Sequence, residues 1–354
     1  MSDILFETRG GVGIATIHRP RALNAMTLAM YRAFAPVLAD WARDPDVHAV
    51  VLRGAGDRAF CAGGDIRLIY DARAHKLGPG DYKSEMFAEE YRFIRDVHRF
   101  PKPYVALAHG ITFGGGAGLS VNGRYRVATE SMAFAMPEVF IGSIPDVGAT
   151  RFFGNCPGRI GVYLALTGAR IGAADAMYCG LYTHHVPDAR LDALVDTLAH
   201  IDWRRGAQAK LVEAVLARFS SPPGEAPLAA LRPDIDRRFG WRSVEGILAA
   251  LQDETADWGR SALDAMGRAS PTSLKIVFEL LRRGAGLELE EALILEYRII
   301  QHLLRGDDFY EGVRSVVVDK DRRPRWRPAT LAEVYNDDVE TYFHTLGDAE
   351  LRLD

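Results

Sequence analysis

The sequence predicts an α/β fold over residues 1–190 and a mainly helical region over residues 191–354. Two observations lead to this prediction. Short apolar segments typical of strands recur along the first part, and glycine-rich turns and helical segments lie between them. The second part has helical periodicity almost throughout, and we find no self-similar period in the chain. We therefore expect an α/β core followed by a helical region that packs on it.

The first elements read as a β-hairpin, a helix and a buried strand. Apolar and polar residues alternate on both sides of Gly10 and Gly11, in LFETR and VGIATIH. An amphipathic pattern then predicts a helix over TLAMYRAFAPVLADWARD, and the apolar run HAVVLRG predicts a strand. This order of elements is typical of an α/β unit.

The middle of the core repeats the alternation of helix and strand. Helical patterns run through DIRLIYDARAH and through EMFAEEYRFIRDVHRF, which Pro101 ends. Strand patterns follow in PYVALAHG and RYRVATESMAFAM, and the glycine-rich GGGAG between them leads into a short helix, GLSVNG.

Composition narrows the class of protein. The chain has 354 residues, is 48% hydrophobic and carries a formal net charge of -4, so strong attraction to nucleic acid or membranes is not indicated. No apolar run reaches membrane-spanning length, and the start MSDILFETRGGVG lacks the pattern of a signal or transit peptide. The 3 cysteines have neither CxxC nor metal-ligand spacing. We therefore expect reduced thiols and a cytoplasmic location.

Two glycine-rich turns are the first candidate site. FCAGGDI, residues 60–66, and HGITFGGGAGL, residues 109–119, each lie between an apolar strand and an expected helix. Free backbone N–H groups at such turns can bind an oxygen that becomes negative in a transition state. The alternative is that the glycines only allow strand and helix to pack closely. Neither turn has the spelling of a dinucleotide-binding or P-loop motif, and HExxH is absent.

Two carboxylates eight positions apart are the second candidate. Glu138 and Asp146 lie in FAMPEVFIGSIPDVGATRFF, and a fully extended chain would separate them by about 26 Å. Gly142 and Pro145 permit a turn that brings the two side chains together. A poorly solvated glutamate there would have a raised pKa and could act as base or nucleophile. The alternatives are a solvated strand end for Glu138 and a helix N-cap for Asp146.

These segments resemble the crotonase (enoyl-CoA hydratase/isomerase) superfamily. The likeness over the first 190 residues lies in HRPRALNAMTLAM, FCAGGDI, ITFGGGAGLS and FAMPEVFIGSIPDVG. Within the superfamily, the 3-hydroxyisobutyryl-CoA hydrolase group is also resembled by EEYRFI, SPTSLKI and DFYEGVRSVVVDKDRRPRWRPA. The resemblance implies a crotonase-like (ββα)-type spiral core with a helical C-terminal extension. Because relatives form trimers and hexamers, it also allows a homo-oligomer.

The resemblance implies roles for particular residues. Backbone N–H groups of Gly64 and Gly115 would form an oxyanion hole, and Glu138 and Asp146 would be catalytic. Crotonase-type hydratases use a second glutamate where this chain has Gly118, which disfavours hydration of a double bond. Further substrate contacts implied by the likeness are Glu90, which would meet the acyl hydroxyl, and Ala22, Ala62, Gly63 and Ile66, which would contact CoA.

The expected reaction is hydrolysis of a short 3-hydroxyacyl-CoA, with 3-hydroxyisobutyryl-CoA of valine breakdown as the substrate that the likeness implies. The alternatives are an enoyl-CoA hydratase or isomerase and a non-catalytic CoA-binding scaffold. Because a thioester is already activated, no metal or redox cofactor is expected, and CoA belongs to substrate and product. Arg19 or Arg21 could meet a phosphate. The sequence leaves open whether Glu138 acts as nucleophile or as general base.

Overall fold

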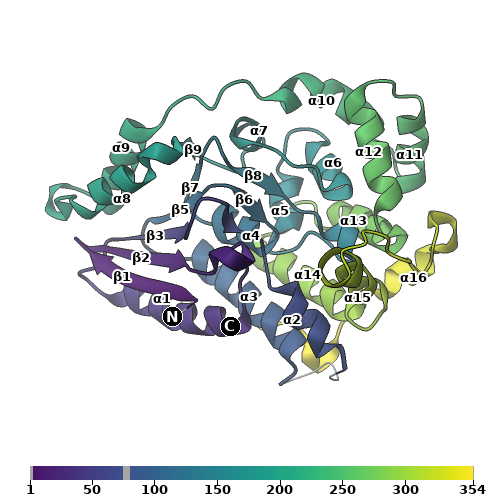
Figure 1. The fold of residues 1–354 in the computed structure, drawn as a ribbon, viewed down its shortest axis with the longest axis horizontal. Coiled ribbons are helices and arrows are strands. Elements are labelled where there is room, and N and C mark those ends of the chain that lie inside the picture. Colours follow the sequence, from purple (N-terminus) through teal and green to yellow (C-terminus); the bar gives the residue numbers. More distant parts are fainter. Residues whose placement is uncertain (1–2, 75–79, 354) are drawn as a thin grey trace. The chain divides into compact units, whose positions relative to one another are not determined.

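The computed structural model describes residues 3–74 and 80–353, which form two compact units (Figure 1). Both units are assembled from segments that alternate along the chain. Unit 1 comprises Met1–Gly64, Arg92–Phe134 and Ile171–Pro227, and unit 2 comprises Asp65–Tyr91, Ala135–Arg170 and Leu228–Asp354. The partition into a core over residues 1–190 and a helical region over 191–354 stays a prediction.

Unit 1 is built on a six-stranded sheet with the strand order β1-β2-β3-β5-β7-β9. Only β1 runs antiparallel to its neighbour; the other pairs are parallel. The strands are β1 (Ile4–Arg9), β2 (Val12–Ile17), β3 (Ala49–Gly54), β5 (Tyr104–Ala108), β7 (Tyr125–Ala128) and β9 (His184–His185). The predicted hairpin is confirmed, and Gly10 and Gly11 at its turn both have positive φ, +56° and +81°, as tight hairpin turns require.

A second, three-stranded sheet has the order β4-β6-β8, with β4 (Ala59–Cys61), β6 (Ile111–Phe113) and β8 (Ala133–Ala135). The strand structure predicted over RYRVATESMAFAM is confirmed, but it consists of two strands, β7 and β8. A turn in which Met132 N–H donates to the Thr129 carbonyl at 3.1 Å separates β7 from β8. This break sends the two halves of the segment into different sheets.

Helices cover both faces of the large sheet, as a largely parallel sheet requires. On one face, Val12 and Ile14 of β2 belong to a buried cluster with Leu194 of α8 (Leu191–Ala199) and Leu216 of α9 (Gln208–Phe219). Gly13, between them, points to the other face, because a Cβ there would lie 2.6 Å from Trp41 of α1 (Leu28–Arg43). The period-2 pattern of the sequence thus places the core correctly.

The remaining helices of unit 1 are short or belong to this unit only in part. They are α4 (Gly115–Val121), α7 (Ala173–Tyr178) and the second half of α3 (Tyr82–His98). Helix α3 ends before Pro101, as predicted. The short helix predicted over GLSVNG is confirmed as α4, but it begins three residues earlier, at Gly115 inside the GGGAG segment.

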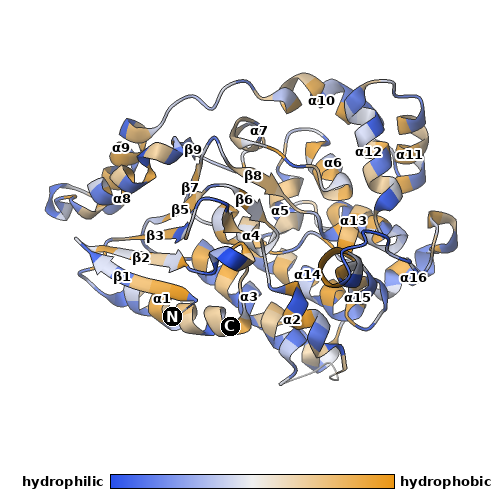
Figure 2. Ribbon diagram, in the orientation of Figure 1, coloured by the Kyte–Doolittle hydropathy of each residue, from blue (hydrophilic) through white to orange (hydrophobic). Residues whose placement is uncertain are grey.

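Unit 2 is mainly helical. Its helices are α2 (Ile66–Asp71), α5 (Ala149–Gly154), α6 (Ile160–Thr167), α10 (Pro227–Arg238), α11 (Val244–Gln252), α12 (Asp257–Arg268), α13 (Pro271–Arg283), α14 (Leu289–Leu303), α15 (Asp308–Val313) and α16 (Asn336–Thr341). The last residue of the predicted helix DIRLIYDARAH lies outside the described residues. Figure 2 shows hydrophilic and hydrophobic residues side by side along α12 and α13, as amphipathic helices require.

The prediction of an α/β core and a helical C-terminal region is confirmed: from Leu191 onward, every regular element in the described part of the chain is a helix. Among residues 3–74 and 80–353, no helix has both the length and the apolar character needed to cross a membrane.

Candidate active site

Two glycine turns lie against each other in unit 1. Strand β4 leads into Gly63 and Gly64, and β6 leads into Gly114 and Gly115, where α4 begins. A Cβ on Gly63, whose φ is +103°, would lie 3.3 Å from Gly115 N, so glycine is needed for the two turns to approach this closely. Within the described chain, neither Gly64 N–H nor Gly115 N–H donates a backbone hydrogen bond. The two N–H groups can therefore both donate to one ligand oxygen, which supports the predicted oxyanion hole.

The residues expected to contact CoA in unit 1 flank these turns. Ala22 ends a short 3-10 helix, and the following Leu23 carbonyl accepts a 3.0 Å hydrogen bond from Ala62 N–H. The guanidinium of Arg19 donates to the Ala25 carbonyl at 2.7 Å, so this side chain holds its own loop. Ile66, the remaining expected contact, is the first residue of α2 and belongs to unit 2.

Unit 2 brings Glu138 and Asp146 together. Glu138 begins a 3-10 helix, Glu138–Ile141, which ends at Gly142 with φ +66°. The chain turns back there, and Ser143 N–H donates to the Glu138 carbonyl at 3.0 Å. A Cβ on Gly142 would lie 2.4 Å from the backbone carbon of Asp308, so this turn requires glycine. The doubling-back predicted between the two carboxylates is confirmed.

Both carboxyl groups are buried: Glu138 is 9% exposed and Asp146 is 6% exposed. Burial raises the pKa of Glu138 well above its usual value, and the nearby charges of Asp146 and Glu90 raise it further. Burial also raises the pKa of Asp146, to about 6. Because an ionised carboxyl disfavours ionisation of its neighbour, the two groups titrate together as a pair. The alternative of a solvated strand end for Glu138 is wrong.

Glu138 also has an uncommitted oxygen. Its Oε2 atom is buried and accepts no hydrogen bond from any described residue. A buried carboxyl oxygen without a partner is costly, and such atoms are few in folded proteins. In a candidate active site, this atom is the one free to act on a ligand.

Tyr91 is a site residue that the sequence reasoning missed. Its hydroxyl donates a 2.6 Å hydrogen bond to Asp146 Oδ2, and its side chain is fully buried. Burial, followed by the charge of Asp146, raises the pKa of Tyr91 well above its usual value, so the phenol stays a donor. This bond opposes the rise of the Asp146 pKa. The sequence offered one signal for Tyr91 as a site residue: it directly follows Glu90 in the EEYRFI segment.

Glu90 lies on α3 and is buried, with 3% exposure, so its alternative role as an exposed helix residue is wrong. Its charge acts on both Glu138 and Tyr91. The structure thus gathers Glu90, Tyr91, Glu138 and Asp146 in unit 2, while Gly64 and Gly115 belong to unit 1.

Glu296 is a second missed residue, and it corrects the expectation that Asp146 also begins the next helix. The N-cap of α5 is Gly148, and no side chain of the cap residue bonds to the first turn. Instead, Glu296 of α14 accepts hydrogen bonds from Gly148 N–H at 2.8 Å and Thr150 N–H at 2.9 Å. A distant carboxyl therefore satisfies the helix start, and the Asp146 carboxyl is left for Tyr91 and Glu138.

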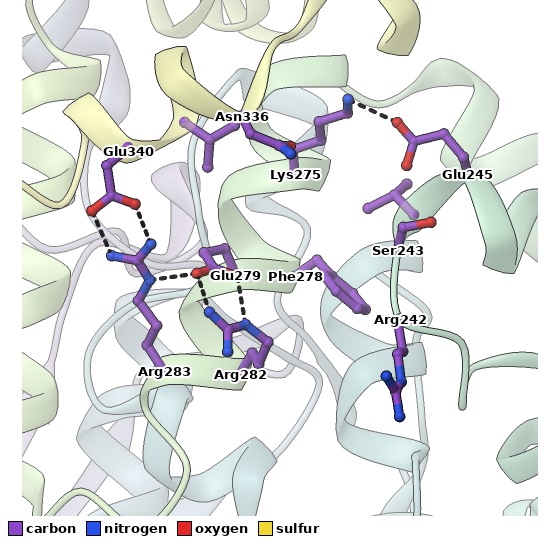
Figure 3. A pocket seen from close by; sticks show the side chains of 12 residues that line it. Arg242, Ser243, Glu245, Lys275, Phe278, Glu279, Arg282, Arg283, Asn336 and Glu340 are labelled. Carbon is purple, nitrogen blue, oxygen red and sulfur yellow. Dashed lines mark hydrogen bonds and ion pairs between the residues drawn. The ribbon is translucent and has the colours of Figure 1, made fainter.

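A pocket elsewhere in unit 2 contains none of these residues (Figure 3). It has a volume of about 350 Å³ and lies between α11, α13 and α16. Each of its carboxylates is paired: Glu245 with Lys275 at 2.7 Å, Glu279 with Arg282 and Arg283, and Glu340 with Arg283. We do not assign the chemistry to this pocket, because no unpaired carboxylate lines it.

Comparison with known proteins gives a consistent result over the whole chain. The family model described as enoyl-CoA hydratase/isomerase matches residues 12–343. Among curated relatives, the protein named 3-hydroxyisobutyryl-CoA hydrolase, mitochondrial, of Danio rerio is 40% identical over 360 residues, covering 99% of this chain and 92% of the relative. The protein of the same name from Homo sapiens is 40% identical over 358 residues, covering 99% and 91%.

Two solved structures match in fold over nearly their full lengths. A protein titled carnitinyl-CoA dehydratase from Mycobacterium thermoresistibile has a TM-score of 0.92 at 39% identity, covering 100% of this chain and 99% of its own. A protein titled enoyl-CoA hydratase from Rhodobacter sphaeroides has a TM-score of 0.90 at 37% identity, covering 99% and 100%. The expected crotonase-like fold is confirmed.

Proposed function

Because the chain belongs to the enoyl-CoA hydratase/isomerase family, we propose that it hydrolyses a short 3-hydroxyacyl-CoA thioester, namely 3-hydroxyisobutyryl-CoA, to 3-hydroxyisobutyrate and CoA. This is a step of valine breakdown. The observation that carries the proposal is the buried Glu138 and Asp146 pair, combined with Gly118 at the position of the second hydratase glutamate. The relatives named as this hydrolase support it over 99% of the chain.

In the proposed mechanism, the thioester oxygen accepts hydrogen bonds from Gly64 N–H and Gly115 N–H. Attack on the carbonyl carbon places negative charge on that oxygen, and two fixed donors stabilise the charge. Removing one donor of this kind typically slows a reaction by a factor of about 100 to 1,000. The close approach of the two glycine turns supports this assignment.

Glu138 supplies the second half of the mechanism. As nucleophile, its carboxylate attacks the carbonyl and the C–S bond breaks, so that CoA leaves as the thiolate. Water then opens the resulting anhydride and supplies the proton that converts the thiolate to the thiol. As general base, it takes a proton from the attacking water. Both routes need deprotonated Glu138, whose pKa is raised, so activity should rise as the pH passes upward through that value. Asp146, held by Tyr91, would orient Glu138, the water or the 3-hydroxyl. Glu90 would contact the acyl hydroxyl.

A second candidate, hydration of an enoyl-CoA, is favoured by the titles of the two solved structures. Addition of water by two glutamates would lack one carboxylate here, because Gly118 has no side chain. Incubation with 3-hydroxyisobutyryl-CoA and with crotonyl-CoA separates the reactions. Thiol release from the first substrate alone supports hydrolysis, and hydration of the second without thiol release refutes it.

A third candidate is a non-catalytic CoA-binding scaffold. It predicts acyl-CoA binding without turnover, and Glu138→Ala would then change nothing measurable. Hydrolysis predicts instead that this variant loses thiol release while it still binds CoA.

The proposal also covers the preferred acyl group, the cellular compartment and the oligomeric state. Discrimination between acyl chains that differ by one methyl is worth only about 1 to 3 kcal/mol, so a panel of short 3-hydroxyacyl-CoAs, including 3-hydroxypropionyl-CoA, is needed. No metal or redox cofactor takes part, and CoA contacts Ala22, Ala62, Gly63 and Ile66. The reaction takes place in the cytoplasm, and the three buried cysteines, none of which forms a disulfide, support this location. Fractionation of cells tests it, since the named relatives are mitochondrial. A homo-oligomer is tested by sedimentation.

A further inference from the structure

The start of helix α13 holds the residue next to Glu138. Ser270, the N-cap of α13, donates its backbone N–H to the Val139 carbonyl at 3.0 Å. Ser270 and Val139 are both fully buried, and a hydrogen bond is stronger in such surroundings than in water. The 3-10 helix that begins at Glu138 is therefore tied to α13 one residue after Glu138 itself.

Helix α15 also packs against this turn, backbone against backbone. A Cβ on Gly142, at the end of the 3-10 helix, would lie 2.4 Å from the backbone carbon of Asp308. A Cβ on Gly312 would likewise lie 2.4 Å from the backbone carbon of Ile141. A displacement of α15 would therefore reach the turn, because close-packed interiors transmit strain.

A buried hydrogen bond joins the two helices that hold the turn. The Ser270 hydroxyl donates to Asp308 Oδ2 at 2.7 Å, and its oxygen accepts the Ser273 N–H at 3.2 Å, which caps α13. The other carboxyl oxygen of Asp308, Oδ1, accepts the Arg327 N–H at 2.8 Å. Asp308 is 8% exposed. Because both of its carboxyl oxygens accept hydrogen bonds from the protein, the role of Asp308 is to hold segments of unit 2 together.

The Glu138 carboxyl depends on the support of its backbone. Its Oε2 atom accepts no hydrogen bond from any described residue, and the donor that opposes the rise of its pKa is its own backbone N–H. The position of the carboxyl therefore follows the position of the turn. A displacement of about 1 Å in a reacting group can slow a reaction by a factor of about 100. Contacts that fix this turn thus bear directly on the reaction.

We propose that Ser270 and Asp308 are positioning residues for Glu138: their hydrogen bond joins α13 to α15, and the two helices together fix the turn from which Glu138 acts. This inference rests on the proposed function, which makes Glu138 the nucleophile or the base in thioester hydrolysis. In this role the pair acts through the backbone of the turn, without contact with the substrate. Loss of the bond should therefore slow the chemical step and leave binding of the CoA thioester unchanged.

Kinetics of variants of the full-length protein test this role. Asp308→Ala and Ser270→Ala each remove the bond; the second is milder, because it keeps the backbone donor to Val139, and it decides alone if Asp308→Ala does not fold. We expect kcat for thiol release, corrected for the folded fraction, to fall about 10- to 100-fold, with KM changed by less than about twofold. Asp308→Asn should rescue kcat, because its oxygen can accept the Arg327 N–H while its amide donates to the Ser270 hydroxyl.

Two controls separate positioning from general stability. Ser243→Ala removes the N-cap of α11, whose hydroxyl accepts the Gly246 N–H at 3.1 Å, and should lower stability without lowering kcat. The double variant Ser270→Ala with Asp308→Ala should have a kcat no lower than that of the slower single variant, because both changes remove one interaction.

Three kinetic results overturn the proposal. They are the kcat of the unchanged protein in a folded Ser270→Ala, an additive loss of kcat in the double variant, and a loss in Asp308→Asn as large as that in Asp308→Ala.

A spectroscopic measurement needs no reaction. The NMR signal of the Glu138 carboxyl carbon, assigned by its absence in Glu138→Gln, reports the surroundings of that group. It should shift in Ser270→Ala and keep its position in Ser243→Ala and Asp308→Asn. An unshifted signal in a folded Ser270→Ala overturns the proposal. If the unchanged protein hydrolyses no thioester, the proposed function fails, while this signal still decides whether the pair positions Glu138.

Discussion

Replacement of Glu296 tests how the fold keeps Asp146 available. This fully buried side chain accepts hydrogen bonds from Gly148 N–H and Thr150 N–H at the start of α5. An unsatisfied buried donor costs about 1 to 3 kcal/mol, so Glu296→Ala should destabilise the fold by about 2 to 6 kcal/mol. Glu296→Gln keeps one acceptor oxygen and should cost about half as much.

The pH dependence gives the experiment a second readout. Burial raises the pKa of Glu296 to about 8, although the two backbone donors oppose the rise. Because the folded value exceeds the unfolded one, the stability linked to this group is complete below about pH 4, and is lost as the pH rises toward 8. Glu296→Gln removes this loss. Its penalty, measured by urea unfolding, should therefore be larger at pH 5 than at pH 9.

Activity separates a purely structural role from a positioning one. Val147 and Gly148, with φ of +53° and +90°, connect Asp146 to the helix start that Glu296 holds. Loosening this turn should weaken the Tyr91 bond to Asp146, so kcat should fall even under conditions where Glu296→Gln is folded. The exposed Glu225→Gln serves as a control for the loss of one carboxylate. Unchanged unfolding free energy in both Glu296 variants, or full kcat in a destabilised variant, would refute this reasoning.

Three more predictions follow from the same site. Glu138→Gln should lower kcat by a factor of about 100 to 10,000, and should raise the thermal unfolding temperature more at pH 8 than at pH 5, because it removes a buried carboxyl whose raised pKa makes ionisation costly. Tyr91→Phe removes the hydrogen bond that opposes the rise of the Asp146 pKa, so the pKa of Asp146, followed by NMR titration, should move upward from about 6. Gly142→Ala should destabilise the fold by roughly 1 to 3 kcal/mol in urea unfolding, whereas Gly154→Ala, with open space around its Cβ, should not.

Each of these predictions has an outcome that contradicts it. Thiol release by Glu138→Gln at the rate of the unchanged protein would remove Glu138 from the mechanism. An unchanged pKa of Asp146 in Tyr91→Phe would mean that the Tyr91 hydrogen bond does not hold that pKa down. Equal stability of Gly142→Ala and Gly154→Ala would show that the turn after Glu138 tolerates a side chain.

Local patterns in the chain were enough to predict most of the elements. Alternation around Gly10 and Gly11 gave the hairpin, and apolar runs gave β3 and β5. The two-residue strand β9 was missed because it is too short to carry a period, and its pairing with β7 lies 57 positions back along the chain, between His184 and Val127. The spelling of the glycine turns likewise identified candidate donors without showing that the turns meet.

The order of residues is enough to identify the reactive groups: two glycine turns, a glutamate and an aspartate with a turn between them, and a glycine at the position of the second hydratase glutamate. The environment that shifts the pKa values of these groups and holds them in place exists only in the folded chain. Tyr91 and Glu296 reach their partners across 55 and 148 positions of sequence. No local pattern can specify such contacts, because they exist only after burial has removed competing water and packing has brought distant segments together.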